Sequence, residues 1–184
     1  MIIIGITGSF GSGKGTVVEY LVSQKGFTHY SVSKFLTEKI VRRGKTVDRN
    51  EMTKIANEIR TKNGPDYIVK KLFKKAVSEN KNVVIESIRN PEEARFIKNN
   101  GGYLFSVDAN QKTRYQRIKL RASEKDSVSF REFKLQEKKE SNSTNPNAQN
   151  LSICMAMADF KIQNNLSINN LTKKVEKIIK YISD

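Results

Sequence analysis

The sequence predicts an α/β fold in which a five-stranded parallel sheet is flanked by helices. Three observations support this prediction. Short runs of apolar, β-branched residues alternate with longer amphipathic segments, and the first run is continuously apolar, as buried parallel strands require. Neither an internal repeat nor a long linker divides the 184 residues. A chain of this length suits one domain, which buries roughly 70% of the surface of its unfolded chain.

The first half of the chain contains three predicted strands and four predicted helices. The strands are expected at residues 2–6, 27–32 and 82–86. The helices are expected at residues 14–25, 33–43, 48–62 and 65–79. Gly26 is typical of a helix end. The sequence DRNE at 48–51 has the spacing of a capping box, and Pro65 suits the first turn of the helix that it opens.

The second half repeats the alternation. Strands are expected at residues 103–107 and 159–163, and helices at 90–100, 111–121, 129–140 and near the C-terminus. Asn90 and the capping box that begins at Ser129 mark two helix starts. Residues 141–150, SNSTNPNAQN, are polar and predict a loop. Strands that are separated by helices in this way imply a doubly wound parallel sheet.

Composition narrows the class of protein. With 34 Lys and Arg against 19 Asp and Glu, the net charge is +15, which favours polyanionic partners such as nucleic acid or phosphorylated small molecules. A lysine-rich, solvated surface explains the charge equally well. The single cysteine, Cys154, fits a core position and a reducing cytoplasm. No run reaches the roughly 20 apolar residues of a membrane span, so we expect a cytoplasmic protein without a membrane partner.

The most specific signal follows the first strand. The sequence GSFGSGK at 8–14 fits the pattern G-x-x-x-x-G-K between a buried strand and a helix N-terminus. In such a loop, glycines let successive backbone amides surround a phosphate, and the positive end of the helix adds to the attraction. A dinucleotide-binding G-x-G-x-x-G pattern is excluded because Thr16 stands where its third glycine belongs. The predicted phosphate-binding residues are Gly8, Ser9, Gly11, Ser12, Gly13, Lys14, Gly15 and Thr16.

The hydroxyl after the lysine is displaced by one position, since Gly15 precedes Thr16. In this form, GSGKGT resembles the adenylate-kinase and nucleoside-monophosphate-kinase branch of the P-loop proteins. The resemblance implies ATP as the phosphoryl donor, bound by Lys14, and Mg²⁺ as the metal. Thr16 is the hydroxyl that we expect to contact Mg²⁺, directly or through water.

The segment VVIESIRN at 83–90 resembles the third strand of these kinases, which carries an acid at its end and an arginine beyond. Strand carboxyl ends open onto the ligand crevice of a doubly wound sheet. Glu86 is therefore expected to orient Mg²⁺ or its waters, and Arg89 to face the transferred phosphate. The alternatives are an ordinary surface acid for Glu86 and a structural salt bridge for Arg89.

Three arginines, Arg114, Arg117 and Arg121, lie on one stripe of a predicted helix. The stripe resembles the lid of nucleotide kinases, which closes over the triphosphate and neutralises its charge. We assign residues 114–145 to this lid, with Asp126 as a possible pairing partner. A solvated basic face is the alternative.

Near the C-terminus, MADFKIQNN at 157–165 is similar to the stretch that precedes the last helix in nucleotide and dephospho-coenzyme A kinases. The resemblance implies that Asn164 lies along the adenine ring. One segment departs from the pattern: in SVSKFLTEKI, Thr37 stands where adenylate-kinase-like sequences carry an acceptor-binding arginine. We assign residues 33–64 to the acceptor. The candidate acceptor-binding residues are Ser33, Arg42, Arg43, Arg60 and Arg89.

The resemblance spans most of the chain and predicts a single P-loop kinase domain over residues 1–184. It implies an ATP- and Mg²⁺-dependent transfer of a phosphoryl group to a nucleotide-like acceptor by a monomer or homodimer. The residues expected to act in catalysis are Lys14, Arg89, Arg117 and Arg121. Dephospho-coenzyme A is an alternative acceptor. Two other classes also fit: an ATPase that is associated with nucleic acid, and a homologue that binds nucleotide without catalysis.

Overall fold

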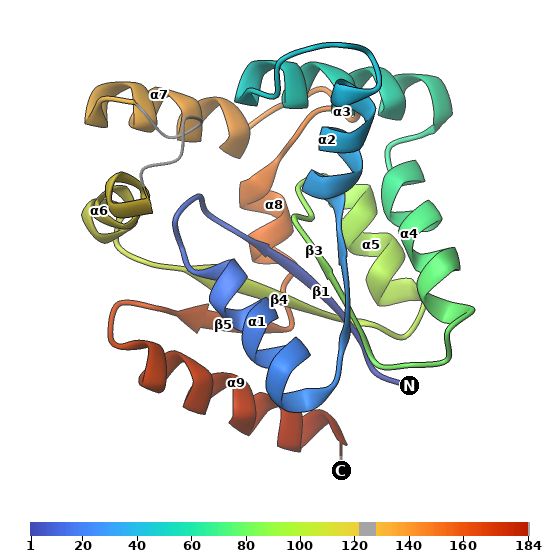
Figure 1. The fold of residues 1–184 in the computed structure, drawn as a ribbon, viewed down its shortest axis with the longest axis vertical. Coiled ribbons are helices and arrows are strands. Elements are labelled where there is room, and N and C mark those ends of the chain that lie inside the picture. Colours follow the sequence, from blue (N-terminus) through green and yellow to red (C-terminus); the bar gives the residue numbers. More distant parts are fainter. Residues whose placement is uncertain (122–127, 184) are drawn as a thin grey trace.

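The computed structural model describes residues 1–121 and 128–183. Over these residues the protein forms a sheet of five parallel strands in the order β2-β3-β1-β4-β5 (Figure 1). The strands are β1 (Ile3–Gly8), β2 (Thr28–Ser31), β3 (Val83–Glu86), β4 (Tyr103–Asp108) and β5 (Phe160–Gln163). The predicted α/β fold is confirmed, including every strand, with ends that agree to within two residues.

Helices cover both faces of the sheet. The helices are α1 (Lys14–Lys25), α2 (Val32–Val41), α3 (Arg49–Asn63), α4 (Tyr67–Val77), α5 (Pro91–Asn99), α6 (Gln111–Arg121), α7 (Phe130–Ser141), α8 (Leu151–Ala156) and α9 (Ile168–Ser183). The apolar residues of α1 and α9 pack with Ile4, Ile6 and Phe105 in one core cluster. Those of α2, α3, α4, α5 and α8 form a second cluster with Ile3, Ile85 and Leu104. Alternate residues of β1, β3 and β4 thus enter opposite cores.

The sheet order changes direction at β1, which pairs with β3 on one side and β4 on the other. At such a point the helices after neighbouring strands diverge to opposite faces and leave a crevice beyond the strand carboxyl ends. The segment after Gly8 enters this crevice, and Glu86 lies level with Ile6 in the register of β1 and β3. Figure 1 shows α3, α6 and α7 around the same end of the sheet. The topology therefore gathers segments that are far apart in sequence.

Two local features differ from the sequence prediction. Helix α4 begins at Tyr67 rather than at Pro65 because Pro65 and Asp66 lie in a turn, which the backbone N–H of Tyr67 closes by donating to the carbonyl oxygen of Gly64. Residues 141–150 precede an unpredicted helix, α8, which Asn150 caps by accepting a hydrogen bond from the backbone N–H of Ile153. Cys154 of α8 is fully buried, as its sequence context predicts. No helix within residues 1–121 and 128–183 is long and apolar enough to span a membrane.

Candidate functional site at the phosphate loop

The loop between β1 and α1 has the backbone shape of an anion-binding turn. Gly13 precedes α1 in the left-handed region (φ 99°), and no side chain of the described residues caps the helix start. The first backbone amides of α1 and the positive end of its dipole are therefore directed at the crevice. A bound phosphate would supply the acceptor that a capping side chain supplies elsewhere.

Glycine is required in the loop because its backbone adopts positive φ angles and because the loop packs tightly against its neighbours. At Gly11 (φ 75°) an added Cβ would lie 2.5 Å from the carbonyl oxygen of Arg114, and at Gly13 it would lie 2.3 Å from Nδ2 of Asn164. At Gly15 an added Cβ meets no heavy atom within 4 Å in the described structure. Gly15 thus borders open space beside the first turn of α1.

Lys14 lies inside the loop that it is predicted to serve. Its ammonium donates hydrogen bonds to the carbonyl oxygens of Gly8 (2.9 Å) and Ser9 (2.8 Å). Burial, with repulsion from Arg89 as the next cause, lowers the pKa of Lys14 from 10.5 to about 7. The hydroxyl of Ser12 is buried and has no hydrogen-bond partner among the described residues. An ammonium, an unused hydroxyl and a helix N-terminus suit a polyphosphate.

Glu86 lies at the carboxyl end of β3, where the sequence predicts it. Its Oε1 atom accepts hydrogen bonds from the hydroxyls of Ser31 (3.2 Å) and Ser87 (3.0 Å). No cluster of three or more His, Cys, Asp or Glu side chains in the described parts of the chain could hold a metal by itself. Protein sites for Mg²⁺ often combine one carboxylate with substrate phosphates and water. Glu86, with Thr16 in the first turn of α1, fits that donor set.

Arg89 contacts an acid that the sequence did not single out. Its Nη1 atom lies 2.5 Å from Oε2 of Glu140, in the last turn of α7, and 3.1 Å from Oε1 of Gln149. Nη1 of Arg49, at the start of α3, lies 3.9 Å from the other oxygen of Glu140. The alternative of a salt bridge for Arg89 is therefore realised in this structure, with an acid from the proposed lid.

The aromatic ring of Phe10, inside the phosphate loop, joins three elements. The guanidinium carbon of Arg49 lies 3.4 Å from the ring centroid, and that of Arg121 lies 5.6 Å from it. Such cation–π contacts attract guanidinium groups to the face of an aromatic ring and help to fix their positions. Phe10 therefore brings the start of α3 and the end of α6 to the loop.

The other two arginines of the stripe bind the backbone around the loop. Arg114 is 7% exposed, donates to the carbonyl oxygens of Ala109 (2.7 Å) and Phe10 (3.2 Å), and pairs with Glu137 of α7. Arg117 donates to the carbonyl oxygen of Asn164 (3.0 Å). The stripe thus lies beside the phosphate loop. Asp126, the possible partner, lies outside the described residues.

Asn164 supports the loop from behind. It is 6% exposed, and its Nδ2 atom donates to the carbonyl oxygen of Ser12 (2.8 Å). The sequence resemblance instead implied a contact with an adenine ring. In this structure the side chain binds the backbone of the phosphate loop, and the contact with an adenine ring stays a prediction.

Arg60 takes a position different from the one expected of an acceptor-binding arginine. It is 1% exposed, and its Nε and Nη2 atoms donate to Oε1 of the fully buried Glu93 (3.1 and 2.8 Å). A guanidinium enclosed in this way is not offered to a ligand, because its charge is already compensated inside the protein. The sequence missed this placement because nothing local distinguishes Arg60 from a surface arginine.

The remaining acceptor candidates lie on or near α2. Ser33 is half-buried in its first turn, Thr37 is half-buried, and Arg42 is exposed at its C-terminal cap. Arg43 is exposed and pairs with Glu58 of α3 at 2.8 Å. The arginine that shares an acid with Arg89 is not one of these candidates. It is Arg49, which lies near the same carboxylate of Glu140.

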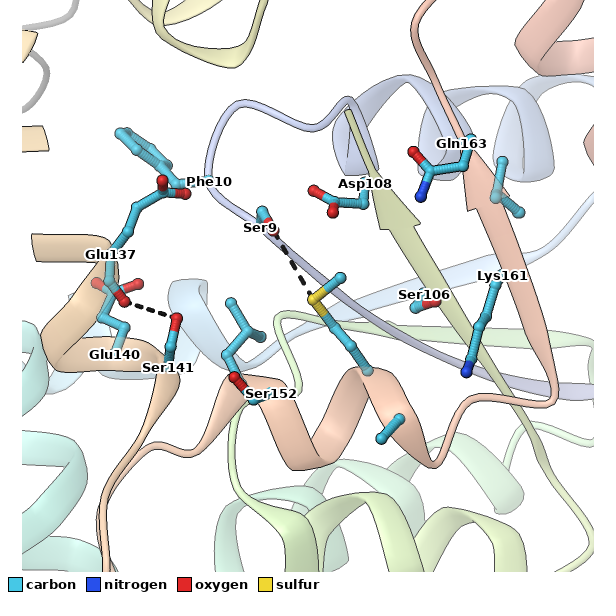
Figure 2. Close-up of a pocket in the computed structure, with 14 residues that line it drawn as sticks. Ser9, Phe10, Ser106, Asp108, Glu137, Glu140, Ser141, Ser152, Lys161 and Gln163 are labelled. Atoms are coloured by element: carbon cyan, nitrogen blue, oxygen red, sulfur yellow. Dashed lines mark hydrogen bonds between the residues drawn. The ribbon is translucent and has the colours of Figure 1, made fainter. Parts of the chain in front are cut away.

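A pocket of about 480 Å³ adjoins the phosphate loop (Figure 2). Ser9 and Phe10 line it, whereas Gly11–Thr16 do not. Figure 2 shows Asp108 and Gln163 pointing into it from the sheet, opposite the acids of α7. Glu137 and Glu140 thus border this pocket and also pair with arginines, Glu137 with Arg114 and Glu140 with Arg89.

Sequence reasoning missed Arg49, Phe10 and Glu140. Phe10 left one signal, an aromatic side chain between the glycines of a phosphate loop. Arg49 and Glu140 left none, because one reads as the first residue of a capped helix and the other as part of a charged helix. Only the tertiary fold brings both to Arg89.

Together, the parallel sheet and the lysine-bearing loop define a P-loop protein with a kinase-like fold. The chain belongs to the AAA domain family, whose profile matches residues 4–143. A UPF0200 protein of Pyrobaculum aerophilum is 29% identical over 178 residues, which are 96% of this chain and 91% of the relative.

Two solved kinases share the fold over nearly their whole length. The shikimate kinase of Aquifex aeolicus has a TM-score of 0.57 at 21% identity and covers 99% of this chain and 98% of its own. The dephospho-CoA kinase of Campylobacter jejuni has a TM-score of 0.53 at 20% identity and covers 98% and 96%. At such identities the likeness establishes the fold alone.

Proposed function

We propose that the protein is an ATP- and Mg²⁺-dependent phosphotransferase of the nucleoside-monophosphate-kinase type. The observation that carries the proposal is the position of Lys14 inside the phosphate loop after β1, beside the carboxyl end of β3, where Glu86 lies level with Ile6 and Arg89 follows three residues later. The kinase-like neighbours support this reading.

In this proposal each residue of the cluster has one task. Lys14 and the loop amides bind the donor phosphates. Glu86 holds the metal, which neutralises charge on the β- and γ-phosphates when it is bound. Arg89, with Arg117 and Arg121 of the proposed lid over residues 114–145, stabilises negative charge as the γ-phosphorus changes partners. The bond to the leaving ADP oxygen breaks, and a bond to an oxygen of the acceptor forms.

Phosphoryl transfer depends on positioning and charge stabilisation more than on a strong base. The site matches this requirement, since its prominent groups are cations and backbone amides rather than a histidine. A nucleotide-like acceptor suits the same surroundings, because an acceptor that carries a phosphate would be attracted by the arginines at the crevice.

The direct experiment combines purified protein, ATP and Mg²⁺ with a panel of nucleoside and deoxynucleoside monophosphates and dephospho-coenzyme A. Formation of ADP together with a phosphorylated acceptor is expected for at least one nucleotide. Lys14→Ala should lower turnover by at least about a hundredfold, because it removes a fixed charge from the transferring phosphates. Lys177→Ala, an exposed lysine on α9, is the matched control and should retain full turnover.

Two results would reject the proposal. Full turnover in Lys14→Ala would show that the loop does not serve catalysis. ATP hydrolysis that never phosphorylates an acceptor would instead favour an ATPase. Circular dichroism of Lys14→Ala establishes whether the fold of the variant is intact.

A further inference from the structure

The carboxylate of Glu140 occupies the space between two arginines of different elements. Oε2 lies 2.5 Å from Nη1 of Arg89, beyond β3, and Oε1 lies 3.9 Å from Nη1 of Arg49, at the start of α3. The side chain of Glu140 is 13% exposed, and those of Arg49 and Arg89 are 17% and 22% exposed. An anion with two oxygens is thus held where α3, α7 and the segment after β3 meet.

Both guanidinium groups are held in place by contacts other than Glu140. Arg49 packs on the ring of Phe10 and donates to Oε1 of Gln136 (2.7 Å). Arg89 donates to Oε1 of Gln149, a residue that is 8% exposed. Preorganised, partly desolvated arginines bind carboxylates and phosphates strongly because they lose little freedom on binding. The arginine pair would therefore keep its geometry for another anion.

The position of Glu140 on its own helix is unfavourable. It lies in the last turn of α7, where the negative end of the helix dipole repels a carboxylate and favours the neighbouring lysines. Burial alone would raise the pKa of Glu140, but the attraction of Arg89 and Arg49 outweighs it and lowers that pKa. The arginines, not the helix, keep Glu140 ionised in this place.

The charges of the surrounding cluster show what a ligand would change. Two arginines, Arg49 and Arg89, and two acids, Glu86 and Glu140, surround Lys14 and all act on its pKa of about 7, after burial. The arginines and the acids offset each other. Withdrawal of Glu140 would leave one uncompensated guanidinium, which a phosphate monoester dianion would neutralise together with the protonated ammonium of Lys14 that it favours.

We propose that Arg49 and Arg89 form the binding site for the anionic group of the acceptor, and that Glu140 fills this site as a tethered competitor until the acceptor arrives. The acceptor phosphate would take the place of the carboxylate, which would release the end of α7 from the crevice. While no acceptor is bound, the carboxylate of Glu140 shields the two arginines. This inference rests on the proposed kinase function for its purpose but concerns binding alone.

The test measures binding of inorganic phosphate to the full chain by calorimetry at low salt. Glu140→Gln removes the competitor and keeps the shape of the side chain, so phosphate affinity should rise about tenfold or more. Glu132→Gln removes the same charge from the first turn of α7 and retains the capping-box role of that residue. Its affinity should stay within about twofold of the wild-type value.

A second pair of variants separates this site from the phosphate loop and guards against loss of folding. Glu140→Gln with Arg49→Gln should lose the gain. Glu140→Gln with Lys14→Ala should keep it, whereas a gain that comes from phosphate bound at the loop should be lost in that second combination. Glu140→Asp keeps the charge but shortens its reach, so it should fold and show an intermediate gain. Added phosphate should also restore the unfolding temperature that Glu140→Gln loses.

Three results overturn the inference: Glu140→Gln binds phosphate no tighter than Glu132→Gln, the gain survives Arg49→Gln, or Glu140→Asp behaves as the wild type. These outcomes are independent of turnover. If the protein transfers no phosphoryl group but Glu140→Gln binds phosphate more tightly, the anion site stands and the proposed function is rejected. If the protein transfers phosphoryl groups but Glu140→Gln shows no rise in phosphate affinity, the proposed function stands and the role of Glu140 as a competitor is rejected.

Discussion

The ammonium of Lys14 is hydrogen-bonded to the backbone of the phosphate loop. Carbonyl oxygens of Gly8 and Ser9 accept its hydrogen bonds at 2.9 and 2.8 Å, in a place where burial and Arg89 disfavour its charge. A polyphosphate would reverse this balance, because its negative charge favours the protonated amine. Binding of nucleotide and protonation of Lys14 are therefore linked.

This linkage predicts a pH dependence. The pKa of Lys14 is about 7 in the free protein, and a bound polyphosphate should raise it. Affinity for a non-hydrolysable ATP analogue should be greatest below pH 7 and fall by up to about tenfold per unit as pH rises above 7. Calorimetry at pH 8 in two buffers of different ionisation heat should detect uptake of nearly one proton.

Lys14→Arg is the control for this prediction. A guanidinium stays charged at pH 8, so nucleotide binding by that variant should take up no proton, whatever its affinity. Binding by the wild-type chain without proton uptake at pH 8 would contradict the linkage.

At the scale of elements, one buried ion pair connects α3 to α5 and also shapes the site. Glu93 is fully buried; its Oε1 accepts from Arg60, while its Oε2 accepts from the backbone N–H groups of Arg89 and Asn90 (both 3.2 Å). The same carboxylate thus caps α5 and fixes the main chain that carries Arg89. A pair in this position sets geometry, even though its net contribution to stability can be small.

Glu93→Gln should be strongly destabilising. It leaves the charge of Arg60 buried without compensation, which typically costs about 3–5 kcal/mol of unfolding free energy. Urea unfolding measures this change. Glu92→Gln, an exposed neighbour on α5 that pairs with Arg95, is the control and should be close to neutral. A loss in Glu93→Gln below about 1 kcal/mol would show that Arg60 finds other compensation.

At the scale of the whole molecule, the sequence predicted what depends on short stretches of chain. Residues 2–6 and 82–86 read as buried strands because their apolar runs are continuous, and the phosphate loop was recognised because its glycines and lysine are consecutive. Helix α8 escaped prediction because six residues are too few for a 3.6-residue period to show.

The acceptor side could not be predicted in the same way. The roles of Arg49, Arg60 and Glu140 depend on partners 33 to 91 positions away, and the sequence offered several equivalent arginines. In the folded protein Arg60 is buried in the core, whereas Arg49 lies at the crevice. The net charge of +15 did not help, since it is spread over the chain and does not mark the few cations that meet.

The most direct test of the phosphate-loop site is a crystal structure of the full chain with Mg²⁺ and a non-hydrolysable ATP analogue. We expect the triphosphate to lie within hydrogen-bond distance of the backbone amides of residues 11–16. The ammonium of Lys14 should have moved from the carbonyl oxygens of Gly8 and Ser9 to phosphate oxygens. A nucleotide bound elsewhere, with Lys14 still on those carbonyls, would contradict this expectation.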